Sequence, residues 1–172
     1  LSLWGSQARL CIISKKFGLD VRGLRYPGII SNEAFPGGGT TDYAVESFYE
    51  AIKNKKYTCF LKEDTYLPMM YMPDALNAIM QLAEAPISKL KHHADFNVNA
   101  MSFSPKELVK EIQREIPDFV VDYKPDFRQQ IADSWPKSLD DSAARKEWGW
   151  TPKYNIRQMT VDMIEKLSAK LK

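Results

Sequence analysis

The sequence predicts an α/β fold in which short strands alternate with helices. Two patterns indicate this fold: apolar residues recur with helical spacing over residues 44–52, and side chains alternate along residues 57–61. Proline and glycine separate such segments along the chain, and no internal repeat interrupts them. The chain has 172 residues, of which 44% are hydrophobic, so it can bury a core but is too short for two ordinary domains.

The first third of the sequence predicts a helix, a strand and a glycine-rich loop. Residues 3–16 are mixed in character and predict a helix, which Gly18 would end. Residues 21–26 predict a short strand that stops at a Pro-Gly pair, and residues 29–41 predict a loop.

The helix expected next begins at Thr41 or Asp42, either of which can cap it. Its apolar residues lie on one face: Ala44, Val45, Phe48, Ala51 and Ile52. After the strand expected at residues 57–61, Pro73 and Asp74 open another helix that Pro86 ends. That helix carries Leu76, Ile79, Leu82 and Ala83 on one side.

The second half of the chain predicts strands at 96–98 and 119–123, and three helices. Ser104 and Glu107 form a capping box with proline at the first helical position, which indicates a helix start. Ser142 can cap a short helix that ends near Gly149, and Asn155 can cap the last helix. The last helix would turn a set of apolar residues inward: Ile156, Met159, Met163, Ile164, Leu167 and Leu171.

Charge and cysteine content exclude several classes of function. The 24 Lys+Arg and 22 Asp+Glu nearly cancel, which disfavours a nucleic-acid-binding or membrane-surface protein. No apolar run reaches the ~18–20 residues of a membrane span. Cys11 and Cys59 are too few for a cysteine-rich zinc site, and the adjacent His92 and His93 favour a solvated loop pair, so we expect no metal.

A run of three glycines followed by Thr40, Thr41 and Asp42 is the most distinctive local motif. Glycine lets a ligand approach the backbone closely, and the N-terminus of the following helix offers free N–H groups to a carboxylate or phosphate. The same residues also suit a simple flexible turn with a capped helix. Composition alone leaves both interpretations open.

Two other patterns have a catalytic and an ordinary interpretation. Tyr49 and Lys53 match Tyr-x-x-x-Lys, in which a nearby ammonium lowers the pKa of a phenol, but an amphipathic surface pair explains them as well. Trp135 follows a polar stretch and could form the wall of a pocket or be an ordinary half-buried loop residue. No Gly-x-Ser-x-Gly and no Gly-x-Gly-x-x-Gly sequence occurs in the chain.

Six short blocks together resemble the short-chain-dehydrogenase-type L-threonine 3-dehydrogenases, over about residues 17–172. They occur in the order of that family: residues 24–31, 36–45, 67–71 with Asp74, 99–103, 134–136 and 140–150. More broadly, the chain is similar to the C-terminal half of extended short-chain dehydrogenases and sugar-nucleotide epimerases. The resemblance implies that residues 1–31 are the remnant of a Rossmann half and that residues 32–172 are mostly a substrate-binding subdomain.

The resemblance also implies the chemistry of the site. The family oxidises the 3-hydroxyl of L-threonine with NAD to 2-amino-3-ketobutyrate, using a tyrosine, a lysine four residues later and a serine. Four residues carry over to the cofactor: Tyr26, Pro27, Gly28 and Ile29. Five residues carry over to the substrate: Gly39, Thr40, Thr41, Asp42 and Trp135. Thr hydroxyls and N–H groups suit a carboxylate, and Asp42 suits an ammonium.

Several parts of the family pattern are missing from these 172 residues. The glycine-rich dinucleotide loop is absent, and no tyrosine precedes Tyr26, so we assign no catalytic residue. Tyr49 and Lys53 follow the glycine-rich loop, which places them on another helix than the catalytic pair. We therefore expect a C-terminal fragment or truncated homologue that is inactive alone, with its homodimer in doubt. A sugar-nucleotide epimerase or reductase and a non-catalytic binding module remain alternatives.

Under this resemblance, the cellular compartment of the protein depends on the kind of organism that it comes from. The family is cytoplasmic in bacteria and mitochondrial in eukaryotes, and no recognisable transit peptide decides between them.

Overall fold

The computed structural model describes residues 12 and 16–171, and these residues form the expected α/β fold. The helix predicted over residues 3–16 and Cys11 therefore lie outside the described residues, apart from positions 12 and 16. The strands form three small sheets that are mainly parallel, as expected for short strands that alternate with helices.

The strands pair between segments that are distant in sequence. β1 (Leu24–Arg25) pairs in parallel with β5 (Phe96–Asn97), and β3 (Lys56–Cys59) pairs in parallel with β7 (Val120–Tyr123). The third sheet has the order β2-β4-β6: β4 (Leu67–Tyr71) lies between β2 (Gly28–Ile30), which is parallel to it, and β6 (Met101–Phe103), which is antiparallel.

The helices agree with their predicted caps in most cases. α4 (Pro105–Glu115) and α7 (Ile156–Lys170) each begin with a complete capping box, at Ser104 and Asn155. α2 (Tyr43–Lys53) and α3 (Met72–Glu84) also lie where the apolar spacing predicts helices. α6 (Ser142–Trp148) ends at Gly149 in the left-handed conformation, but its N-cap is Asp141 rather than Ser142.

Five segments differ from the sequence prediction. Residues 28–30, expected to be a turn and loop, form β2 because they pair with the fully buried strand β4. β4 itself has no alternating pattern, since all five of its side chains are buried, and β6 is only three residues long. The short helix α5 (Arg128–Asp133) and the 3-10 turn at Ile87–Lys89 also gave no clear sequence signal.

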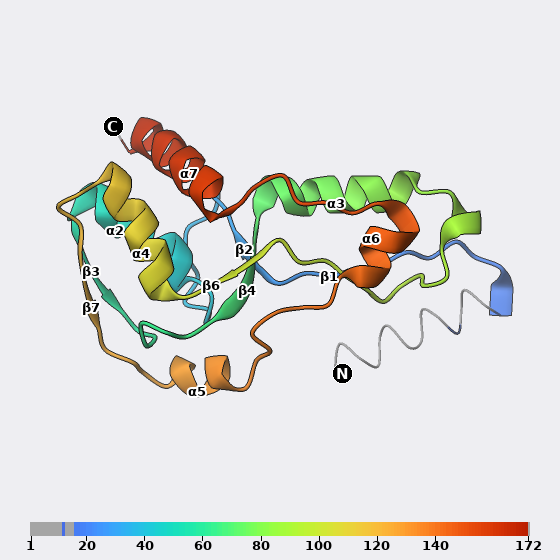
Figure 1. Ribbon diagram of the computed structural model, residues 1–172, viewed down its shortest axis with the longest axis horizontal. Helices are drawn as coiled ribbons and strands as arrows, with labels where there is room; N and C mark the ends of the chain where they lie inside the picture. The colour runs from blue at the N-terminus through green and yellow to red at the C-terminus, as the bar shows by residue number, and fades with distance from the viewer. Residues whose placement is uncertain (1–11, 13–15, 172) are drawn as a thin grey trace.

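The apolar residues form two cores, one towards each end of the elongated molecule (Figure 1). The first core gathers residues of α2, α4 and α7 with β3 and β4, and the inward-facing residues of α7 predicted from the sequence pack there. The second core joins α3, α6, β1 and β5. A buried carboxylate joins α3 to the chain entering α7, because Asp74 accepts N–H groups from Lys153 (2.9 Å) and Tyr154 (3.0 Å).

Of the side of α3 predicted to carry Leu76, Ile79, Leu82 and Ala83, only Leu82 is buried. Leu76 is 57% exposed and Ile79 41%, whereas Asp74, Ala75, Ala78 and Leu82 are the buried residues of the helix. The division of the chain at residue 31 stays a prediction, and β1 on one side of it pairs with β5 on the other.

Candidate functional site

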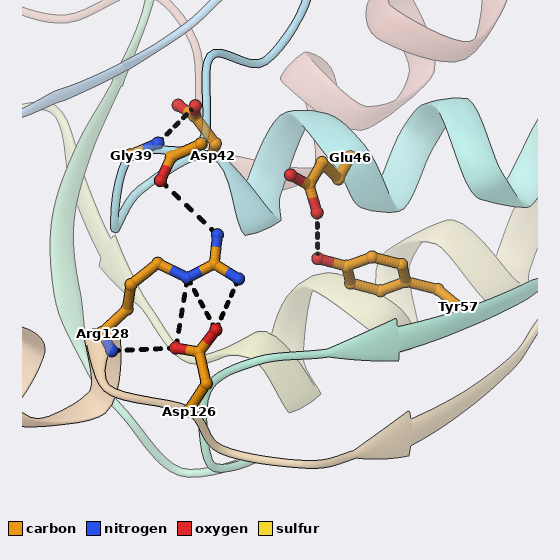
Figure 2. Close-up of polar contacts among 7 residues, drawn as sticks. Gly39, Asp42, Glu46, Tyr57, Asp126 and Arg128 are labelled. Atoms are coloured by element: carbon orange, nitrogen blue, oxygen red, sulfur yellow. Dashed lines mark hydrogen bonds and ion pairs between the residues drawn. The ribbon is translucent and has the colours of Figure 1, made fainter.

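The glycine-rich loop is held by the residue that follows it. The Asp42 carboxylate accepts hydrogen bonds from the backbone N–H groups of Gly37 (2.7 Å) and Gly39 (2.8 Å), as Figure 2 shows for Gly39. Gly38 between them has φ +91°, a conformation that favours glycine. Asp42 occupies the N-cap position of α2 without capping the helix through its side chain. The Asp42 side chain therefore stabilises the loop before α2 and makes no hydrogen bond to the first turn of α2.

The structure brings the two predicted binding segments into contact. Gly28, at the start of β2, lies so close to Thr41 that a Cβ at Gly28 would stand 2.6 Å from Thr41 Cγ2 and 2.6 Å from Met69 Sδ. Only glycine fits there without displacing a neighbour, because real Cβ atoms essentially never approach other atoms so closely. The segment of residues 26–29 thus contacts the segment of residues 39–42 through Gly28 and Thr41.

The residues of the first segment keep part of their surface accessible. Tyr26, Pro27, Gly28 and Ile29 are all half-buried. The Tyr26 hydroxyl donates to the carbonyl of Ala75 on α3 (2.9 Å), and burial raises the pKa of this phenol. Tyr26 is therefore fixed against α3 as a neutral group.

An arginine that the sequence analysis missed lies against the glycine-rich loop. Arg128, the first residue of α5, pairs through its guanidinium with Asp126 (Nη2 to Oδ2, 2.7 Å) and reaches the Gly38 carbonyl from Nη1 at 3.5 Å (Figure 2). The guanidinium also lies 3.2 Å from the ring centroid of Phe60. Nothing local in the sequence links Arg128 to Gly38, because the two residues are 90 positions apart.

A buried phenol paired with a half-buried carboxylate lies beside this arrangement. The Tyr57 hydroxyl on β3 donates to Glu46 on α2 at 2.8 Å (Figure 2). Burial, and then the hydrogen bond to Glu46, raise the pKa of Tyr57 far above its ordinary value. Tyr57 therefore stays protonated and joins β3 to α2, the helix that follows the loop.

Trp135 lies just beyond α5, away from the residues that bind Asp42. It is 41% exposed and helps to line a cavity of about 240 Å³ together with Thr65, Tyr66 and Lys137. In the part of the chain that the structure describes, no hydrogen bond or ring contact joins Trp135 to the glycine-rich loop. The link between them runs through α5, which carries Arg128 at its start.

The pair Tyr49 and Lys53 does not have the geometry of an activated phenol. The Lys53 ammonium lies over the Tyr49 ring, 5.6 Å from its centroid, and the ring also packs on Phe35 at 5.2 Å. Both residues line a separate cavity of about 550 Å³ between α2 and β3. The ammonium faces the ring rather than activating the hydroxyl.

The two histidines differ from each other: His92 is exposed as expected, whereas His93 is half-buried and its Nδ1 has no hydrogen-bond partner within the described residues. His92 Nδ1 lies 2.5 Å from Glu147, and within residues 12 and 16–171 no three His, Cys, Asp or Glu side chains gather as a metal site. Cys59 is buried, and burial raises the pKa of its thiol to about 11. No helix in the described residues has the length and apolar character to cross a membrane.

Comparison with known proteins identifies relatives over most of the chain. No protein-family model matches it. The chain is 50% identical over 150 residues to mitochondrial L-threonine 3-dehydrogenase of Bos taurus. The aligned region covers 87% of this chain and 40% of the bovine protein. It is 49% identical over 156 residues to an uncharacterised epimerase/dehydratase of Staphylococcus haemolyticus. The aligned region covers 90% of this chain and 49% of that protein.

Solved structures agree with these relatives. L-threonine dehydrogenase from Phytophthora infestans is 55% identical with a TM-score of 0.93, over 95% of this chain and 53% of that one. The enzyme from Clostridium difficile is 53% identical with a TM-score of 0.94, over 96% of this chain and 52% of that one. UDP-glucose 4-epimerase from Thermotoga maritima, at 18% identity and a TM-score of 0.81, shares the fold.

These comparisons confirm the resemblance found in the sequence. The relatives and structural neighbours are L-threonine 3-dehydrogenases at about 50% identity, together with epimerase/dehydratase proteins. The chain covers the C-terminal half of the extended short-chain dehydrogenase fold and spans about half the length of the curated relatives it matches.

Proposed function

We propose that this chain, as a relative of the L-threonine 3-dehydrogenases, forms the substrate-binding part of an NAD-dependent oxidation of L-threonine to 2-amino-3-ketobutyrate. The contact between Gly28 and Thr41 is the observation that supports the proposal, because the segment we assign to the nicotinamide touches the segment we assign to the amino acid there. Hydride transfer requires the two reactants to lie in contact. Identities of about 50% to L-threonine dehydrogenases over nearly the whole chain support the same activity.

In this proposal the loop residues hold the amino acid. The hydroxyls of Thr40 and Thr41 and the remaining loop N–H groups face the carboxylate, since Asp42 already accepts those of Gly37 and Gly39. Asp42 accepts both loop bonds through Oδ2, and its Oδ1 is the oxygen directed to the ammonium. Trp135 covers the substrate from the end of α5.

Residues 26–29 form the surface for NAD, which supplies the hydride acceptor when bound. Their half-buried side chains fit this role because a flat ring laid on them would cover accessible surface. Gly28 lets the backbone lie directly on Thr41, which keeps the two binding surfaces adjacent.

These 172 residues hold no glycine-rich dinucleotide loop, and their one Tyr-x-x-x-Lys pair is Tyr49 with Lys53, whose ammonium lies over the ring. The chain by itself therefore binds L-threonine without oxidising it at an enzymatic rate. The complete enzyme would act in the cytoplasm of a bacterium or the mitochondrion of a eukaryote, and as a homodimer.

Saturation-transfer NMR on the purified chain tests the proposal, with L-threonine and UDP-glucose offered separately. L-Threonine is expected to receive saturation, and to lose it when Asp42 is replaced in Asp42→Ala. Absorbance at 340 nm in the presence of L-threonine and NAD should stay flat. Saturation of UDP-glucose alone would favour the sugar-nucleotide epimerase, whose fold the chain shares. Binding of neither compound would favour a non-catalytic module.

A further inference from the structure

Arg128 has an unusually fixed guanidinium for a residue near a protein surface. Its Nε lies 3.1 Å and 3.0 Å from the two carboxylate oxygens of Asp126, and its backbone N–H donates to the same carboxylate at 2.8 Å. The Phe60 ring covers one face of the guanidinium, so the side chain is only 18% exposed. An arginine paired and stacked in this way has one preferred orientation.

That orientation directs Nη1 at the glycine-rich loop. Nη1 reaches the Gly38 carbonyl, while the Asp42 carboxylate accepts the N–H groups of Gly37 and Gly39, the second of which Figure 2 shows. The loop is therefore held by a cation at a carbonyl and by an anion at two amides. Each charge contacts the peptide groups of opposite polarity, which defines the orientation of a segment that three glycines would otherwise leave free.

The same helix that begins with Arg128 leads directly to Trp135. The N–H groups of Ser134 and Trp135 donate to the carbonyls of Ile131 and Ala132, both at 3.1 Å, so the turn after α5 continues the helix without a flexible link. Gln129 fixes α5 from the other side, because its Oε1 accepts the N–H of Lys62 at 2.8 Å.

We propose that Arg128 is a positioning residue that sets the glycine-rich loop relative to Trp135. This inference rests on the proposed function, in which the loop and Trp135 contact L-threonine. Arg128 itself acts through these two segments. Its loss leaves the loop held only by Asp42, and α5 no longer fixes the distance between the loop and Trp135.

The test compares Arg128→Gln with the wild-type chain, both labelled with 5-fluorotryptophan. Fluorine NMR reports Trp135, whose resonance is assigned with Trp135→Phe, and hydrogen exchange reports the Gly39 amide. Without ligand, Arg128→Gln is expected to shift the Trp135 resonance and speed exchange at Gly39. With L-threonine, its dissociation constant should rise about ten-fold, because small displacements of binding groups are costly.

Three further variants make the outcome specific. Asp126→Asn removes the partner of the guanidinium and should change both signals in the same direction. Arg128→Lys keeps the charge without the paired geometry and should lie between wild type and Arg128→Gln. Arg145→Gln breaks the comparable Arg145–Asp141 pair (2.8 Å) on α6 and should change neither signal.

Unchanged Gly39 exchange and an unchanged Trp135 resonance in Arg128→Gln would overturn the proposal, and so would a lowered melting temperature with unchanged affinity for L-threonine. If the wild-type chain binds no L-threonine, the proposed function fails. The signals recorded without ligand then still decide whether Arg128 positions the loop.

Discussion

A single glycine determines how closely the two binding segments approach each other. The contact of Gly28 with Thr41 and Met69 leaves no room for a side chain, whereas Gly37 in the nearby loop has no neighbour closer than 4.0 Å to its Cβ position. Local sequence signals indicate Gly28 only as half of a Pro-Gly break, and the family resemblance adds a place beside the cofactor; neither predicts the crowding, which comes from residues 13 and 41 positions away. Close approach in space leaves no local trace in the sequence.

We expect Gly28→Ala to lower the free energy of unfolding by about 1–3 kcal/mol, the usual cost of forcing a methyl group into a packed site. It should also displace Thr41 and weaken L-threonine binding. Thermal denaturation and an NMR titration measure the two effects. Gly37→Ala is the matched control and should retain both properties. Equal behaviour of the two variants would show that the crowding at Gly28 has no consequence.

The Tyr57–Glu46 pair predicts a dependence of stability on alkaline pH. Because the folded-state pKa of Tyr57 is raised, the folded chain keeps a proton that the unfolded chain loses above about pH 10. The free energy of unfolding therefore falls as the pH rises past 10. Tyr57→Phe removes the hydrogen bond at a cost of about 1–2 kcal/mol at pH 7 and makes this fall less steep.

Urea denaturation at pH 7 and pH 10.5 checks this expectation. Tyr66→Phe is the exposed counterpart: the hydrogen bond from the Tyr66 hydroxyl to Glu107 (2.8 Å) also raises the pKa of Tyr66, but without burial, so this variant should change the fall less than Tyr57→Phe does. Parallel pH dependence in wild type and Tyr57→Phe would exclude the assigned role of Tyr57.

At the scale of elements, local signals predicted the helices better than the strands. The capping boxes at Ser104 and Asn155 are encoded within four residues, and both appear in the structure. β4 was missed because complete burial removes the alternation by which a strand is recognised, and β2 exists through its pairing with β4. The contact of Arg128 with Gly38 likewise depends on tertiary packing.

The two serines expected to cap helices give a direct test. Ser104 accepts the N–H of Glu107 in α4, whereas Ser142 lies inside the first turn of α6 with Asp141 at the cap. Ser104→Ala should cost about 1 kcal/mol of unfolding free energy, and Ser142→Ala less than about 0.5 kcal/mol. Chemical denaturation measures the difference. A larger loss from Ser142→Ala than from Ser104→Ala would reverse the assignment of caps.

At the scale of the whole molecule, α3 leaves an apolar strip uncovered. Leu76 and Met80 are 57% and 60% exposed and lie four residues apart on one face, with Ile79 beside them at 41%. Helix spacing places Leu76 and Ile79 on one side with Leu82 and Ala83, and of these four only Leu82 joins the second core, together with Ala75 and Ala78. A contiguous exposed apolar strip of this kind promotes association between molecules.

We therefore expect the purified 172-residue chain to associate, and sedimentation velocity or size-exclusion chromatography with light scattering measures this. Leu76→Glu combined with Met80→Lys should give a 19.8 kDa monomer, because it replaces the strip with an ion pair at favourable helical spacing. Its melting temperature should be unchanged, since neither side chain is buried. Val120→Lys removes an isolated apolar residue that is 56% exposed on β7 and should leave association unchanged. A monodisperse wild-type monomer with a sharp thermal transition would show that the strip on α3 is tolerated in water.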